Sequence, residues 1–193
     1  AAVALLPALV LLAWRSRDRR RALGGLALAP ALFSLYPLLL WRQIDDPLAF
    51  LEAQGTWNRE LSPLGPLGGI WDGVRAVVTG DVPSGAGALH AYAVNGQALA
   101  FLILFLGLTV FAWRRFGAPY GLFAALSLAL PLSVPSERWP LLSLPRFGLV
   151  VFPFFLALAA LGGRPRLHAA IAGVSAIMLG VAVSQWALWQ WVA

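Results

Sequence analysis

Long apolar stretches dominate the sequence and restrict it to one kind of fold. They are continuous rather than alternating, so they differ from the strands of a membrane barrel. Lipid offers no hydrogen-bond partners to the backbone, and only helices or closed barrels satisfy their own peptide groups inside it. We therefore predict an all-α, polytopic transmembrane helical bundle with six spanning helices, at 1–14, 22–41, about 90–113, 118–134, 147–162 and 169–192.

Composition agrees with a chain that is largely surrounded by lipid. Of the 193 residues, 60% are hydrophobic and 11% are charged, whereas soluble domains carry about 25% charged residues. The 14 basic residues are all arginines, and they lie between the apolar stretches without forming a basic face, so we expect no nucleic-acid partner. The chain has no cysteine, which excludes disulfides, thiolate metal sites and cysteine nucleophiles.

The arginines are divided unequally between alternate connections. Those after the first, third and fifth stretches hold nine Arg and one Asp, a balance of +8. The remaining connections hold five Arg and seven acidic residues, a balance of −2, and the two balances sum to the net charge of +6. Arg-rich loops stay cytoplasmic. We therefore predict an integral membrane protein, of a bacterial cell membrane, with its long 42–89 loop on the extracytoplasmic side.

The first apolar stretch is short for a spanning helix. Neither Met nor a basic residue precedes AAVALLPALVLLAW, unlike the start of a signal peptide. Fourteen residues reach ~21 Å, less than the ~30 Å hydrocarbon core. We therefore expect residues 1–193 to be a single bundle that lacks its N-terminal part.

The 42–89 loop is the first candidate for chemistry, since long loops in compact folds are usually functional. Asp46 followed by Pro47 predicts a helix start, with a carboxylate N-cap and proline at the first helical position. A second short helix is expected over 70–80. One interpretation is an interfacial helix in which Asp46 only caps. The other is a lid whose Gln54, Trp57 and Arg59 face a sugar or a phosphate.

The segment SERWPLLSLPRFGLVVFPFF, residues 136–155, is the second candidate. Its prolines break or kink the entry into the fifth spanning helix. Arg146 lies at the outer end of that helix. Its side chain is either an interfacial anchor or an anion clamp, because planar guanidinium suits phosphate.

Other familiar signatures are missing. The sequence contains no phosphate-binding loop, nucleophile elbow or metal-ligand cluster, and its two histidines fall on opposite sides of the predicted membrane. We therefore predict no catalytic residue, metal or cofactor within this chain. Ser184 and Gln185 are expected to form hydrogen bonds between helices.

Two segments together resemble the C-terminal half of PIG-V-type mannosyltransferases. These are DDPLAFLEAQGTW and, about ninety residues later, SLPRFGLVVFPFFLALA. The family carries D-P-x-A-F-x-x-A-Q-x-x-W in an outer loop, and S-x-P-R-[FY] with a following F-P at the start of a late helix. The matching positions are Asp46, Pro47, Ala49, Phe50, Ala53, Gln54 and Trp57, then Ser143, Pro145, Arg146, Phe147, Phe152 and Pro153. The resemblance covers roughly residues 42–160.

The resemblance implies a GT-C glycosyltransferase that transfers a sugar, typically mannose, from a polyprenyl-phosphate carrier on the outer face. Such enzymes place an essential acidic residue in an early outer loop, which this chain does not contain. Asp72 stands in the later loop and does not take over that role. The residues expected to bind substrate are Asp46, Gln54, Trp57, Arg59, Ser143 and Arg146. The partners implied are membrane lipid and the lipid-linked sugar donor, and the donor sugar and the acceptor are left open.

Two other functions fit the same hydropathy. One is a segment of a secondary transporter, since six helices with positive-inside loops are common among carriers. No charged residue lies in the middle of a predicted helix, which counts against ion coupling. The other is a non-catalytic membrane scaffold, in which the long loop would have no pocket.

Overall fold

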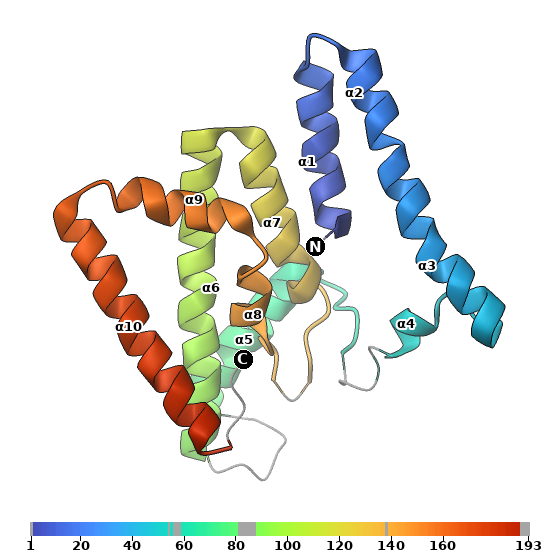
Figure 1. Ribbon diagram of the computed structural model, residues 1–193. Helices are drawn as coiled ribbons and strands as arrows, with labels where there is room; N and C mark the ends of the chain where they lie inside the picture. Colours follow the sequence, from blue (N-terminus) through green and yellow to red (C-terminus); the bar gives the residue numbers. More distant parts are fainter. Residues whose placement is uncertain (1, 54, 56–58, 81–87, 138, 190–193) are drawn as a thin grey trace.

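The structure, a computed structural model, describes residues 2–53, 55, 59–80, 88–137 and 139–189 (Figure 1). Within these residues the chain is helical, with one isolated backbone bridge and no strand, which confirms the all-α prediction. The helices are α1 Ala2–Arg15, α2 Arg19–Leu26, α3 Leu28–Ile44, α4 Ala49–Glu52, α5 Pro66–Thr79, α6 Ala88–Phe116, α7 Ala118–Leu132, α8 Leu144–Gly148, α9 Phe152–Leu161 and α10 Pro165–Ala187.

Three helical segments in the described part of the chain are long and apolar enough to cross a membrane, fewer than the six predicted. They are Arg19–Ile44, Tyr92–Phe116 and Pro165–Ala187. The other apolar helices are shorter: Val3–Arg15, Ala118–Leu132 and Phe152–Leu161. At ~1.5 Å per residue, the ten residues of α9 reach only about 15 Å. The predicted 147–162 helix is divided, because a new helix begins at Phe152 after the break at 149–151, with Pro153 in its first turn.

The packed centre of the molecule lies between α6, α7 and α9, with α1 and α5 against α7. Phe105 of α6 stacks on Phe154 of α9, with ring centroids 4.9 Å apart. The buried face of α1 consists of alanines, including Ala4 and Ala8. Small side chains let backbones approach closely, which is how helices pack where lipid removes the hydrophobic driving force.

Two helices lie at the periphery. Neither α3 nor α10 contains a buried residue, and Figure 1 shows them at opposite sides of the bundle. A side-chain hydrogen bond joins α10 to α6, in which Gln185 Nε2 donates to Gln97 Oε1 at 3.1 Å. The interhelical role predicted for Gln185 is therefore confirmed. The prediction for Ser184 is wrong, because its hydroxyl donates to the Gly180 carbonyl of its own helix.

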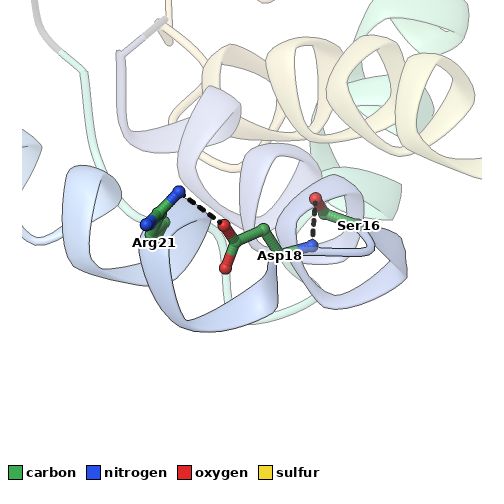
Figure 2. Close-up of polar contacts among 3 residues, drawn as sticks. All are labelled: Ser16, Asp18 and Arg21. Carbon is green, nitrogen blue, oxygen red and sulfur yellow. Dashed lines mark hydrogen bonds and ion pairs between the residues drawn. The ribbon is translucent and has the colours of Figure 1, made fainter.

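The three Arg-rich connections, α1–α2, α6–α7 and α9–α10, lie toward the same end of the bundle, the top of Figure 1. The α1–α2 connection is shown in Figure 2. Asp18 forms an ion pair with Arg21, in which Oδ2 and Nη1 are 3.2 Å apart. The backbone N–H of Asp18 donates a hydrogen bond to Ser16 Oγ at 3.3 Å. Both ion-pair side chains are largely exposed, so the pair adds little stability and mainly shapes the turn.

The region between α3 and α6 contains α4 and α5. Helix α5 begins earlier than the predicted 70–80 segment, because Gly65 in a positive-φ conformation leads into Pro66 at the first turn. Its buried face is Gly68, Gly69, Gly73 and Ala76. A Cβ atom on Gly69 would collide with the Leu132 carbonyl, and one on Gly73 would lie 2.7 Å from Leu141. Gly69 thus brings α5 against the end of α7, and Gly73 brings it against the α7–α8 connection.

Candidate functional site

A short backbone ribbon joins the long loop to the α7–α8 connection. Arg59 and Ser136 form the antiparallel bridge. Glu60 N–H donates to the Pro135 carbonyl at 3.3 Å, and Ser62 N–H donates to the Ser133 carbonyl at 2.9 Å. We call residues 59–62 and 133–136 the ribbon. It brings the chain just after the first resembling segment (45–57) beside the chain just before the second (143–159), although the two sides of the ribbon are more than seventy residues apart in sequence.

Arg59 is held half-buried at one edge of the ribbon. Its guanidinium donates to the carbonyl of Leu142 at 2.9 Å and to that of Val134 at 3.5 Å. It also lies over the Phe147 ring, with Cζ 5.5 Å from the ring centroid. Burial, and then the positive charge of Arg146, lower the pKa of Arg59 below its ordinary value. Two cations are thus placed near each other.

Arg146 is positioned by a turn at the start of α8. Its Nη2 donates to Ser143 Oγ at 2.9 Å. Ser143 is buried and has φ of 63°, a conformation that costs a non-glycine residue about 1–2 kcal/mol. On the other side of Arg146, Gly148 lies so close to the Phe105 ring that a Cβ atom there would overlap it. The exposed Arg146 side chain is therefore held by Ser143, and Phe147, the next residue, carries the ring that lies under Arg59.

Neither Arg59 nor Arg146 forms an ion pair with any carboxylate that the structure describes. A half-buried cation without a counter-charge is unfavourable. A guanidinium has five N–H donors, and Arg59 uses only part of this capacity on carbonyl groups. The pair therefore suits an anion with several acceptor oxygens, such as a phosphate.

A cavity of about 220 Å³ lies against Arg59, and we call it the basic cavity. Arg59 and Ser127 are its polar members, and the rest of the wall is apolar. Its lining residues are Arg59, Ser127, Leu130, Pro131, Val134, Phe147 and Val150. The sequence pattern did not indicate Ser127, which lies in an apolar stretch where a single serine carries no signal.

A second cavity, of about 490 Å³, lies along the ribbon, and we call it the acidic pocket. Glu60, Asp72 and Glu137 line it together with Arg75. Its floor includes Pro135 and Ser136 of the ribbon. The sequence reasoning did not identify this pocket, because its three carboxylates come from three separate segments of the chain.

A third cavity, of about 30 Å³, lies between α6 and the turn before α8. Asn95 and Ser143 are among the residues that line it. Asn95 is 1% exposed, and its Nδ2 has no hydrogen-bond partner among the described residues. A space of this size suits a single water molecule, which would satisfy the amide next to Ser143.

The structure brings together three of the six predicted substrate-binding residues, Arg59, Ser143 and Arg146. Gln54 and Trp57 lie outside the described residues. The prediction that Asp46 is the N-cap of a helix is wrong. The helix begins at Ala49 rather than Pro47, with Leu48 at the N-cap position. Asp46 Oδ1 instead accepts the Leu48 N–H at 2.8 Å. This bond closes the turn before α4, because an Asp side chain readily bonds the backbone two residues on.

No metal site is visible in the described part of the chain, where no three His, Cys, Asp or Glu residues are grouped closely enough to hold an ion. Comparison with protein-family models, with curated proteins and with solved structures gives no match.

Proposed function

We propose that this chain is part of a membrane glycosyltransferase that takes a sugar, mannose by its family resemblance, from a polyprenyl-phosphate carrier on the outer face. The observation that carries the proposal is the arginine pair. Arg146 belongs to the second resembling segment, and Arg59 lies two residues beyond the first. The two charges lie within electrostatic reach of each other, and neither arginine forms an ion pair with a described carboxylate. An anion bound between them would relieve their repulsion.

The surroundings of the pair favour an anion that is attached to lipid. Phe147 lies under the Arg59 guanidinium, and the cavity beside it has a mainly apolar wall. A free inorganic anion would gain nothing from that wall, whereas a phosphate ester with a hydrocarbon chain would use both parts. In this proposal Arg59 and Arg146 bind the carrier phosphate, and Ser143 acts as a positioning residue for Arg146.

The proposal also includes the way in which the helices cross the membrane. We infer that the three shorter apolar helices complete a six-helix bundle with the three long ones, and that the 42–89 loop faces the extracytoplasmic side. The common placement of the Arg-rich connections in Figure 1 supports this arrangement. The arginine pair then lies at the end of the bundle opposite to those connections, where an outer-leaflet lipid presents its phosphate.

One observation favours a second candidate, a segment of an anion transporter. The apolar stretch 147–162 is divided into α8 and α9, and discontinuous helices often form substrate sites in transporters. The two candidates differ in whether a covalent product forms.

The test is sugar transfer in membranes that contain the natural full-length protein, with radiolabelled polyprenyl-phosphate mannose as donor. Arg59→Ala and Arg146→Ala are compared with Arg166→Ala, which removes an exposed arginine from the first turn of α10. Loss of a charged hydrogen bond costs about 1.5–3 kcal/mol. We therefore expect transfer to fall about 10- to 100-fold in the first two variants and to stay unchanged in the third.

Two results would count against the proposal. Equal transfer by all three variants at matched expression would remove the arginine pair from the site. Absence of transfer from any lipid-linked sugar, together with uptake of an anion by the same membranes, would favour the transporter.

A further inference from the structure

The turn between α1 and α2 concentrates positive charge on the surface. Residues 15–21 read RSRDRRR, with five arginines and one aspartate, and all seven are exposed. Their formal charge of +4 is the larger part of the net charge of +6 of the whole chain. Charge of one sign at this density attracts ions and surfaces of the opposite sign.

The fold holds this charge in a defined turn (Figure 2). Asp18 pairs with Arg21, and its backbone N–H donates to Ser16 Oγ. Arg19 Nε donates to the Trp14 carbonyl at 3.0 Å, and its Cζ lies 4.5 Å from the centroid of the Trp14 ring. A run of like charges without such contacts repels itself and extends. These contacts therefore keep the arginines together next to the end of α1.

Most of this charge is not neutralised inside the protein. Of the five arginines, only Arg21 forms an ion pair with a carboxylate that the structure describes. Arg19 uses one of its N–H donors on the Trp14 carbonyl, and a guanidinium has five. Guanidinium groups bind phosphate oxygens through pairs of parallel N–H donors. The turn thus presents to an anion the side chains of Arg15, Arg17, Arg19 and Arg20.

The helices on either side place the turn at a membrane surface. Helix α1 is apolar up to Trp14, and the segment Arg19–Ile44 that follows is long and apolar enough to cross a membrane. Trp14 is 56% exposed, and tryptophan is enriched where the bilayer meets water. Neither α2 nor α3 contains a buried residue, so lipid rather than protein covers most of this helix pair. The arginines then lie at the depth of the lipid phosphates.

We infer that the α1–α2 turn is a docking surface for the headgroups of anionic phospholipids. The exposed arginines bind the lipid phosphates, Trp14 lies beside them at the membrane surface, and Asp18 fixes the turn while it neutralises Arg21. The bound headgroups hold the end of the α2–α3 pair, which the protein itself does not enclose.

Charge complementarity selects this occupant. An anionic leaflet presents many phosphates side by side in one plane, which matches several arginines on one exposed turn, whereas a single free phosphate reaches only one or two of them. The inference goes beyond sugar transfer, because it concerns the opposite end of the bundle from Arg59 and Arg146. It holds equally if the chain is part of a transporter.

The experiment measures by native mass spectrometry the Kd of the first lipid bound to the natural full-length protein in detergent. The probes are phosphatidylglycerol, which is anionic, phosphatidylcholine, which has no net charge, and inorganic phosphate as a competitor. The double variant Arg17→Gln/Arg20→Gln removes two charges from the turn. The matched control, Arg114→Gln/Arg115→Gln, removes two exposed charges from the α6–α7 connection. Thermal unfolding of each variant shows whether the fold is kept.

We expect phosphatidylglycerol to bind at least about tenfold more tightly than phosphatidylcholine. An arginine near an anionic surface contributes roughly fivefold in affinity. The affinity for phosphatidylglycerol therefore falls about 20- to 30-fold in Arg17→Gln/Arg20→Gln and stays within about threefold in the control. In Asp18→Asn it rises about fivefold, because one negative charge is removed and Arg21 is released. A merely structural role of this turn would not produce that gain.

Four results would overturn the inference. Equal binding of the two lipids would remove the role of charge. An equal loss in the two double variants, with both folds intact, would assign the attraction to this whole end of the protein rather than to the turn. Lower affinity in Asp18→Asn with an intact fold would contradict the electrostatic account. Complete displacement of phosphatidylglycerol by inorganic phosphate would identify a site for a free anion. None of these measurements depends on sugar transfer, so the proposed function is tested separately.

Discussion

The basic cavity and the acidic pocket lie next to the same ribbon and have opposite chemistry. Arg59 lines the first and its neighbour Glu60 lines the second. Successive side chains of an extended segment point to opposite faces, so two adjacent residues of opposite charge enter two different cavities. The comparison shows how a few residues of extended backbone, inserted into an all-helical fold, separate a cation from a carboxylate that the sequence places side by side.

The cavities also differ in how their charges are balanced. The acidic pocket contains Arg75 beside its three carboxylates, so part of its charge is opposed from within. The basic cavity contains no carboxylate among its lining residues. Its positive charge is therefore left for a ligand, and this asymmetry is why we place the lipid phosphate there.

The largest effect is expected from Gly69→Val, because it displaces α5, which lines the acidic pocket and packs against the end of α7. The added side chain meets the backbone of Leu132, which cannot yield as a flexible side chain would. Overpacking of this kind costs about 1–3 kcal/mol, or roughly 2–12 °C in apparent Tm for a chain of this size. Thermal unfolding in detergent measures it.

Gly173→Val is the control for that prediction, since an added Cβ there meets no atom within 4 Å. An equal loss of Tm in both variants would show that the loss reflects helix propensity rather than the contact between α5 and α7. Retention of polyprenyl-phosphate binding in Gly69→Val would show that the basic cavity does not depend on that contact.

A smaller effect, confined to one side of the ribbon, is expected from a pair of adjacent variants. Arg59→Met keeps the length of the side chain and removes its charge, and the affinity for polyprenyl phosphate falls about tenfold or more. Glu60→Gln changes the acidic pocket and leaves that affinity within about twofold, because exposed charges are strongly screened. Titration of lipid binding measures both. A similar loss in the two variants would mean that the two cavities act as one site.

The smallest effect is expected from Ser143→Gly, which removes only the hydrogen bond that holds Arg146. Glycine adopts positive φ without cost, so this variant gains up to about 1 kcal/mol of stability at a residue with φ of 63°. The lost hydrogen bond frees Arg146, and lipid affinity falls about two- to threefold. Thermal unfolding is therefore expected to show a gain in stability, and lipid titration a loss in affinity, for the same variant. If stability and affinity fell together, Ser143 would be a structural residue rather than a positioning one.

Local patterns predicted the helical elements well. The continuous apolar stretches correspond to α1, α3, α6, α7 and α10, because a chain without polar partners satisfies its backbone only in helices. The hydrogen bond of Gln185 was also predictable, since an amide in an apolar helix seeks another polar group. The prolines of 136–155 predicted a break or kink at the entry into the 147–162 stretch, and the chain is divided there into α8 and α9. The shortness of α9 was not predicted.

The candidate site was predictable only in part. Arg59, Ser143 and Arg146 were identified by sequence, whereas Ser127 and the carboxylates of the acidic pocket were not placed. The role predicted for Asp46 as a helix cap was wrong. Its side chain closes a turn instead, and the helix begins at Ala49, a shift that the pattern of apolar residues does not reveal.

From the order of the residues alone we obtain the helical class, the alternation of arginine-rich connections and the chemical types of side chain in the two resembling segments. These follow from hydropathy and charge, which act residue by residue. Tertiary structure alone decided that Arg59 meets Phe147 and Arg146, that Glu60 turns to the other side, and that Ser127 is left without a partner. The reason is that these contacts join segments more than sixty residues apart, and their geometry depends on close packing at Gly69, Gly73 and Gly148.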